Sequence, residues 1–126
     1  MGCSMFGIGT DIVEIRRIKK ILELYPDKFP LKILGPEELE LLNNRPKHIE
    51  FIAGRFAAKE AILKAFGTGL RNCSWGDIII LNDDLGKPVV NINGNLLKMV
   101  KDHGIRNIHI SISHGQEFAV AFCIIE

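Results

Sequence analysis

Residues 51–69 read FIAGRFAAKEAILKAFGTG, and this stretch decides the centre of the fold. Its apolar residues recur at helical spacing from about residue 47 to residue 66, which predicts one long helix with a broad apolar side. Gly67-Thr68-Gly69 follows directly and is a sufficient stop for that helix. Glu60 and Lys64 lie one turn apart beside the apolar side, so the helix also carries candidates for chemistry.

Shorter segments of alternating or periodic hydrophobicity surround the long helix. The pattern predicts strands at 6–13, 77–81, 89–92, 108–113 and 118–125, the last one buried, and shorter helices at about 12–25, 36–43 and 96–103. Turn residues at 82–87 and 114–117 join two pairs of strands into hairpins. We therefore expect a single α+β domain over residues 1–126.

The composition argues against several classes of protein. The formal net charge is +1, so the molecule as a whole has no general attraction for nucleic acid. No apolar run reaches the roughly twenty residues that span a bilayer, so we expect no membrane partner. Cys3, Cys73 and Cys123 lack the spacing of metal ligands or of a disulfide framework, which favours a reducing, cytoplasmic compartment. Gly2 and Cys3 resemble a lipidation signal only loosely, because a strand follows at once.

Asp11 is a carboxylate in an otherwise small or apolar segment, GIGTDIVEI at 7–15. Burying an ionised carboxylate costs free energy unless the group pairs, caps a helix or binds a cation. One interpretation is a helix N-cap, because a helix is predicted just afterwards. The other is a ligand for a hard cation. The segment alone leaves both interpretations open.

The long helix offers similar pairs of interpretations. Glu60 and Lys64 are either an ordinary ion pair between successive turns or a Mg²⁺ ligand beside a phosphate-binding lysine. Arg55 and Lys59 are either a solvated basic face or part of an anion site. Gly67 either only ends the helix or lets backbone N–H groups approach a phosphate.

Two further polar patterns lie outside the long helix. The alternation of HISISH at 109–114 points His109, Ser111 and Ser113 to one side, as an exposed strand face or as the lining of a ligand cleft. Basic residues cluster on the first helix, as the solvent side of an amphipathic helix or as a docking patch for an acidic partner: Arg16, Arg17, Lys19 and Lys20.

Five segments together resemble the bacterial holo-acyl-carrier-protein synthases, the short group of 4′-phosphopantetheinyl transferases. They are GIGTDIVEI, FIAGRFAAKEAILKAFGTG, SWGDIIIL, LGKPVV and HISISHGQEFAVAFCIIE, which follow the family's order over nearly the whole chain. The resemblance implies the family's α+β fold, with an antiparallel sheet and a long central helix. It also implies Mg²⁺-dependent transfer of the 4′-phosphopantetheine group from coenzyme A to a serine of apo acyl carrier protein, in fatty acid biosynthesis. Adenosine 3′,5′-bisphosphate would be released, and a homotrimer would share active sites between neighbouring subunits.

The same resemblance implies roles for individual residues. Asp11 and Glu60 match the two magnesium ligands, and Lys64 matches the lysine that contacts the coenzyme phosphates. We take Glu60 and Lys64 as the candidate catalytic residues, with Glu60, directly or through a metal-bound water, accepting the serine proton. Arg17 matches a residue that docks the carrier protein. Arg55, Lys64, His109, Ser111 and Ser113 match the coenzyme-binding region, and Gly67 joins this candidate set through its backbone N–H.

The main alternative is a non-catalytic module of the same fold that binds a nucleotide or a carrier protein. A missing lysine or carboxylate in the 51–69 segment would favour it, and both are present. A structural or assembly protein is the other alternative, and it predicts no dependence on magnesium.

Overall fold

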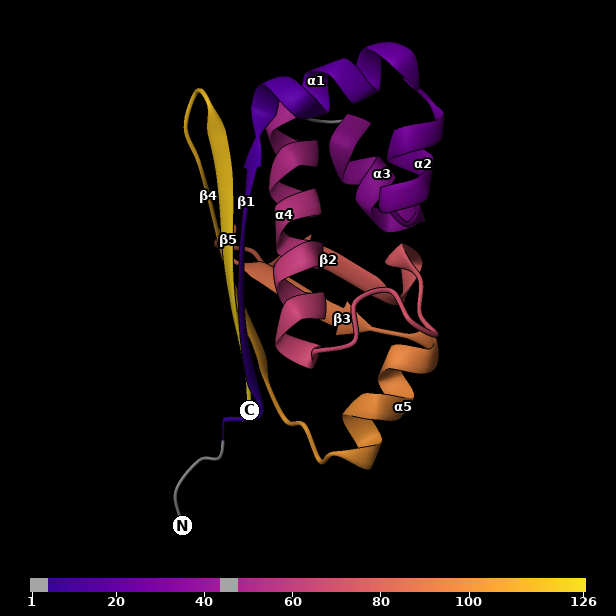
Figure 1. The fold of residues 1–126 in the computed structure, drawn as a ribbon, viewed down its shortest axis with the longest axis vertical. Coiled ribbons are helices and arrows are strands. Elements are labelled where there is room, and N and C mark those ends of the chain that lie inside the picture. Colours follow the sequence, from indigo (N-terminus) through magenta and orange to yellow (C-terminus); the bar gives the residue numbers. More distant parts are fainter. Residues whose placement is uncertain (1–4, 44–47) are drawn as a thin grey trace.

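The computed structural model describes residues 5–43 and 48–126 of the chain (Figure 1). Within these residues the elements are, in order, β1 (Gly7–Glu14), α1 (Ile15–Leu24), α2 (Lys28–Ile33), α3 (Pro36–Asn43), α4 (His48–Phe66), the short 3-10 helix η1 (Trp75–Asp77), β2 (Ile78–Asn82), β3 (Pro88–Ile92), α5 (Gly94–Asp102), β4 (Ile108–His114) and β5 (Phe118–Ile125).

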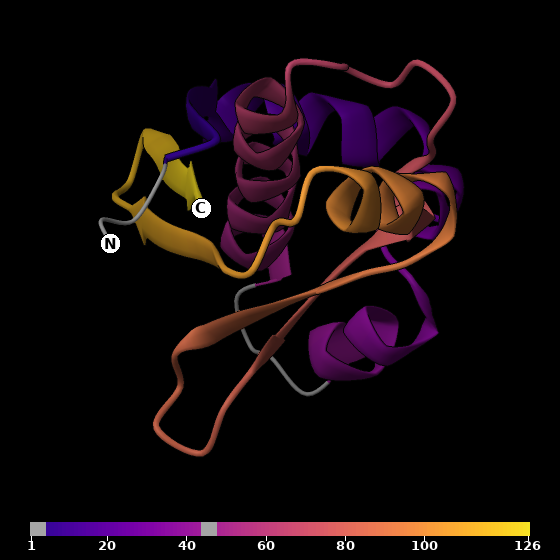
Figure 2. The same ribbon diagram turned by 90° about the horizontal axis from the view of Figure 1, so that it is seen from below.

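Helix α4 lies between two antiparallel sheets. Strands β1, β5 and β4 form one sheet in that order, and β2 pairs with β3 in a hairpin. Helices α2, α3 and α5 lie with this hairpin on the side of α4 away from the three-stranded sheet, and α1 crosses one end of α4 (Figure 1). Figure 2 shows the β2–β3 hairpin extending away from the rest of the chain. The predicted α+β class, long central helix and two hairpins are confirmed.

Glycines in β1 allow this strand to approach α4 closely. A Cβ on Gly7 would overlap the carbonyl oxygen of Ala65, and a Cβ on Gly9 would overlap that of Ala61. Two residues of a strand and four residues of a helix each advance about 6–7 Å, so alternate residues of β1 meet successive turns of α4. Asp11 is the next residue in this alternation, and it faces the same helix.

The outer face of the three-stranded sheet, turned away from α4, is apolar. We define the outer sheet face by side chains of β1 and β5 that are 39–63% exposed: Ile8, Ile12, Phe118, Val120 and Phe122. The prediction of a buried strand at 118–125 is wrong for this face, because only alternate residues of β5 are buried. The described elements leave the face open to solvent (Figure 1).

Several element boundaries differ from the predictions. Helix α1 begins at Ile15 rather than near residue 12, because β1 continues to Glu14. Helix α2 was not predicted, since it has only six residues and contains Pro30. The first turn of a helix tolerates proline, because the N–H groups of that turn have no partner within the helix. The predicted start of α4 at Lys47, and the residues Gly2 and Cys3, lie outside the described residues. None of the described helices is long and apolar enough to cross a bilayer.

Candidate active site

Asp11 and Lys64 form the centre of the candidate site. Lys64 Nζ donates hydrogen bonds to Asp11 Oδ1 at 2.9 Å and to Thr10 O at 3.1 Å. The side chain of Asp11 is only 15% exposed, and the lysine provides its ion pair across the interface between β1 and α4. The interpretation of Asp11 as a helix cap is wrong, because Glu14 occupies the N-cap position of α1.

Glu60 lies beside this ion pair, one helical turn before Lys64. Burial raises the pKa of Glu60, the negative charge of Asp11 raises it further, and the positive charges of Lys64 and Arg17 lower it. Among the described ion pairs, Lys64 pairs with Asp11. The interpretation of Glu60 and Lys64 as an ordinary ion pair between helical turns is therefore wrong. The structure therefore brings together the two predicted carboxylates and the predicted lysine.

Arg17 lies on the surface of α1, near the carboxylate of Glu60. It is exposed, and its charge is close enough to lower the pKa of Glu60. The other basic residues of α1, which are Arg16, Lys19 and Lys20, are exposed as well. We call these four residues the α1 basic patch. A partner bound to this patch would have its own groups next to Glu60.

Arg55 lies in a cavity of about 820 Å³ between α4 and the β2–β3 hairpin. One guanidinium nitrogen, Nη2, donates a hydrogen bond to Asn82 Oδ1 at 3.3 Å, and the guanidinium carbon lies 4.6 Å from the centre of the Phe51 ring. The interpretation of Arg55 and Lys59 as a solvated basic face is wrong, because they are 6% and 0% exposed.

Sequence reasoning missed most of the residues that line the Arg55 cavity. Asn82, Asp83 and Asp84 lie where the sequence indicated only a turn, and Pro88 where it indicated only the start of a strand. His114 reaches the cavity from the end of β4. The signal that could have identified them is the density of polar side chains in this turn, which exceeds what a tight hairpin needs.

The polar row His109, Ser111 and Ser113 lies on the outer side of the three-stranded sheet. All three residues are exposed, and Ser111 pairs with Phe122 of the outer sheet face. Asp11 faces α4 on the opposite side of the same sheet. Within one chain, therefore, the structure does not bring the polar row to the carboxylates. The ring of His109 contacts Glu126 instead, with Nε2 3.1 Å from Oε1.

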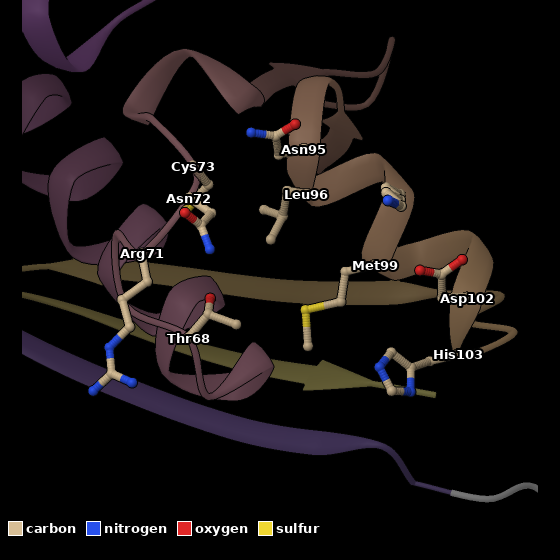
Figure 3. A pocket seen from close by; sticks show the side chains of 10 residues that line it. Thr68, Arg71, Asn72, Cys73, Asn95, Leu96, Met99, Asp102 and His103 are labelled. Atoms are coloured by element: carbon tan, nitrogen blue, oxygen red, sulfur yellow. The ribbon is translucent and has the colours of Figure 1, made fainter.

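Gly67 ends α4, as the sequence predicts. Its N–H donates hydrogen bonds to the carbonyl oxygens of Leu63 at 2.9 Å and Lys64 at 3.1 Å, and its φ of +79° lies in the left-handed region. Beyond it, residues 68–73 and α5 enclose a second cavity of about 460 Å³ (Figure 3). Cys73 lines this cavity, and burial raises the pKa of its thiol, so the thiol is a weak nucleophile at neutral pH.

The donor set of Asp11 and Glu60 fits a small, hard cation. No group of three or more His, Cys, Asp or Glu side chains converges among the described residues. Magnesium needs only one or two protein carboxylates when phosphate oxygens and waters complete its coordination. The lysine ammonium 2.9 Å from Asp11 also shows that the carboxylate accepts a positive charge at this position. Asp11 and Glu60 are therefore the residues that could hold Mg²⁺.

Comparisons with known proteins identify the family of the chain and agree with its fold. Residues 7–123 match the 4′-phosphopantetheinyl transferase superfamily. A holo-[acyl-carrier-protein] synthase of Clostridium novyi is 47% identical over 97% of this chain and 88% of the relative. The structure of such a synthase from Neisseria meningitidis has a TM-score of 0.92 and 39% identity, over 98% of this chain and 99% of the other. A Bacillus anthracis synthase in complex with CoA (3′,5′-ADP) has a TM-score of 0.81 and 40% identity, over 98% and 97% of the chains.

The agreement extends over nearly the whole chain, in sequence and in fold, and includes the strand and the helix that carry the candidate site. The chain therefore belongs to the 4′-phosphopantetheinyl transferase superfamily and, within it, to the holo-[acyl-carrier-protein] synthases.

Proposed function

We propose that the chain transfers the 4′-phosphopantetheine group from coenzyme A to a serine hydroxyl of apo acyl carrier protein and releases adenosine 3′,5′-bisphosphate. The observation that carries the proposal is the meeting of Asp11, Glu60 and Lys64, which come from a strand and a helix far apart in the chain. The coenzyme bound to the Bacillus anthracis relative supports coenzyme A as the donor.

Asp11 and Glu60 would hold Mg²⁺, which when bound neutralises charge on the coenzyme pyrophosphate and on the leaving nucleotide. Lys64 adds a second positive charge beside them. Its side chain is 55% exposed, so the ammonium can turn from Asp11 towards a bound phosphate. Positioning and fixed charge supply most of the catalysis in phosphoryl transfer, and these three side chains supply both.

Glu60 is the group that accepts the proton of the attacking serine, directly or through a water. In the metal-free chain, burial and the neighbouring Asp11 raise the pKa of Glu60, and Lys64 and Arg17 lower it. The carrier protein would deliver its serine by docking on the α1 basic patch, because Arg17 lies at the edge of the same site.

Arg55, Gly67 and the polar row are the remaining coenzyme-binding residues of the proposal. Arg55 offers a fixed charge in a cavity large enough for a nucleotide. The polar row His109, Ser111 and Ser113 reaches an active site only if a second chain contributes it, since it lies across its own sheet from Asp11.

We therefore include a homotrimer in the proposal. The outer sheet face is an apolar surface of the kind that oligomers bury, and it lies next to the polar row on β4. Assembly through this face would cover the exposed apolar side chains. The proposal further requires that the polar row of one subunit lie near the carboxylates of its neighbour.

The proposed setting is the cytoplasm, in service of fatty acid biosynthesis. Cys73 and Cys123 are free thiols, which supports a reducing compartment.

Mass spectrometry of the carrier protein tests the proposal. Apo acyl carrier protein is mixed with this chain, coenzyme A and Mg²⁺, and the carrier should gain the mass of one phosphopantetheine group on its serine. Coenzyme binding without this gain in mass would make the chain a non-catalytic binding module. A chelator such as EDTA should suppress the reaction, and undiminished transfer in EDTA would contradict the metal role.

A further inference from the structure

Glu38 and Lys59 form a charged pair inside the molecule that the proposed reaction does not use. Lys59 Nζ lies 2.7 Å from Glu38 Oε1, and both side chains are 0% exposed. Replacing a buried ion pair by apolar residues of similar size is often neutral or stabilising. Stability alone is therefore a weak reason for this pair, and the groups that it holds are more informative.

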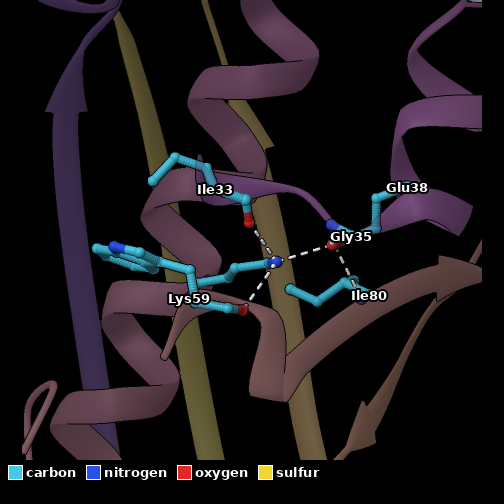
Figure 4. Close-up of polar contacts among 6 residues, drawn as sticks. Ile33, Gly35, Glu38, Lys59 and Ile80 are labelled. Atoms are coloured by element: carbon cyan, nitrogen blue, oxygen red, sulfur yellow. Dashed lines mark hydrogen bonds and ion pairs between the residues drawn. The ribbon is translucent and has the colours of Figure 1, made fainter. Parts of the chain in front are cut away.

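Lys59 binds two backbone carbonyl groups in addition to Glu38 (Figure 4). Its ammonium donates hydrogen bonds to Ile33 O at 2.6 Å, at the end of α2, and to Trp75 O at 3.3 Å, in η1. All three donors of the ammonium are thus used. Burial lowers the pKa of Lys59, and the charge of Glu38 opposes that change.

Glu38 binds two backbone N–H groups with the same carboxylate. Gly35 N donates to Oε1 at 2.9 Å, and Ile80 N donates to Oε2 at 3.0 Å. The bond to Ile80 matters most, because it fixes β2 along the edge that does not pair with β3. The ion pair therefore connects α3, α4 and β2 at one buried point.

Two polar connections join α4 to β2, one buried and one partly buried. Lys59 reaches Ile80 through Glu38, and Arg55 reaches Asn82 directly at 3.3 Å. Arg55 and Lys59 are one turn apart on α4, while Ile80 and Asn82 are two residues apart on β2. Moving β2 relative to α4 would therefore also move Asn82 away from Arg55 and change the cavity between them.

We propose that the Glu38–Lys59 pair positions the β2–β3 hairpin against α4, so that Arg55 and Asn82 present a fixed wall to the nucleotide end of the coenzyme. Glu38 and Lys59 are positioning residues and touch no substrate. The identity of the ligand rests on the proposed function.

The double variant Glu38→Leu/Lys59→Met tests this proposal. It replaces both charges by apolar side chains of similar size, so no buried charge is left unpaired. Titration calorimetry with adenosine 3′,5′-bisphosphate on the full chain should show a Kd raised about tenfold or more, the loss expected when a hydrogen bond to a charged group is displaced. The KM for coenzyme A should rise while kcat at saturating coenzyme stays nearly unchanged. Amide hydrogen exchange should quicken in residues 78–92 and stay unchanged in the three-stranded sheet.

Leu96→Ala is the matched control, because it removes a buried side chain of α5 that takes no part in the ion-pair network. It should lower the melting temperature and leave the Kd unchanged. A folded double variant with the Kd of the unmodified chain would overturn the proposal.

A second variant keeps the proposal testable if the double variant does not fold. Glu38→Gln keeps the shape of the side chain and removes its charge, and its Kd then decides between the same two outcomes. Failure of both variants to fold would show that the pair serves stability and would also overturn the proposal. An unmodified chain that neither binds the bisphosphate nor modifies the carrier would refute the proposed function instead.

Discussion

Glu60 has two tasks in the proposed reaction, and its surroundings bear on both. Metal binding needs an ionised carboxylate, and accepting a serine proton needs a basic one. Burial and Asp11 raise the pKa of Glu60, while Lys64 and Arg17 keep the anion accessible by lowering it. Two effects therefore raise the pKa of Glu60 and two lower it. Single substitutions can remove each of the three neighbouring charges, those of Asp11, Lys64 and Arg17, separately.

Glu60→Gln should lower kcat by about 100-fold or more, the contribution typical of a general base, without loss of the fold. Turnover of the carrier protein and the melting temperature are the two measurements. Glu37→Gln, an exposed carboxylate on α3, is the control and should keep both values. Normal turnover in Glu60→Gln would contradict both proposed roles of this residue.

The pKa of Glu60 in the metal-free chain should lie above that of an ordinary glutamate, and carboxyl NMR can measure it. Asp11→Asn should lower this pKa by removing a negative neighbour, and Arg17→Ala should raise it by removing a positive one. Because the folded pKa exceeds the unfolded one, Glu60 stabilises the metal-free fold at low pH. That contribution is lost as the pH rises through the folded pKa. An unshifted or lowered pKa in the unmodified chain would contradict the prediction that burial and Asp11 outweigh Lys64 and Arg17.

Arg17→Glu should raise the KM for the carrier protein more than the KM for coenzyme A, because the α1 basic patch is the proposed docking surface for the carrier. Added salt should produce the same selective loss in the unmodified chain, since it screens exposed charges. Lys101→Glu on the exposed side of α5 is the control for a change of net charge. Equal effects of Arg17→Glu on both KM values would argue against a docking patch.

At the level of elements, the contact between β1 and α4 builds the site. The sequence predicts this strand and this helix well, because alternation and helical spacing are local patterns. It does not predict that β1 pairs with β5, since pairing between distant strands leaves no local pattern. Nor does it predict that Lys59 is buried, because its partner Glu38 lies in another helix and looks like an ordinary first-turn carboxylate. The resemblance indicated Asp11, Glu60 and Lys64, and the structure explains why they meet.

Gly9→Ala should push β1 away from α4, because the added Cβ would overlap a backbone oxygen that cannot move aside. Overpacking of this kind costs about 1–3 kcal/mol of stability. Turnover in the folded fraction should fall further, by up to about 100-fold, because Asp11 is displaced from Lys64. Chemical denaturation and kcat are the measurements. Gly115→Ala has open space around the added Cβ and should change neither. Full activity of Gly9→Ala would show that the close contact is not needed.

At the level of the whole molecule, the proposed assembly rests on the exposed outer sheet face and on the polar row, which lies away from the carboxylates of its own chain. The sequence could not predict whether the polar row faces α4 or the outside of the sheet. Alternation shows which residues share a side of a strand, but it does not show which other element packs against that side. The trimer and the single domain over residues 1–126 stay predictions.

Phe122→Glu should prevent assembly, because it places a charge in the middle of the outer sheet face. Light scattering should then report a monomer, and the transfer activity should be lost with the assembly. Leu31→Glu changes a leucine on α2 that is also exposed, at 64% against 41% for Phe122, but lies away from this face, and it should remain a trimer. A fully active monomer of Phe122→Glu would contradict the shared active site.

Gly7, Gly9 and Asp11 alternate along β1, so the side to which the Asp11 carboxylate points depends on whether the number of residues before it is odd or even. Successive strand residues point to opposite sides, so deleting Thr10 would turn the carboxylate from the buried helix to the solvent side. Removing or adding one residue between Gly9 and Asp11 should thus abolish the reaction, although every catalytic side chain would still be encoded. Spacing changes by two residues would restore the orientation of the carboxylate, one helical turn further along α4.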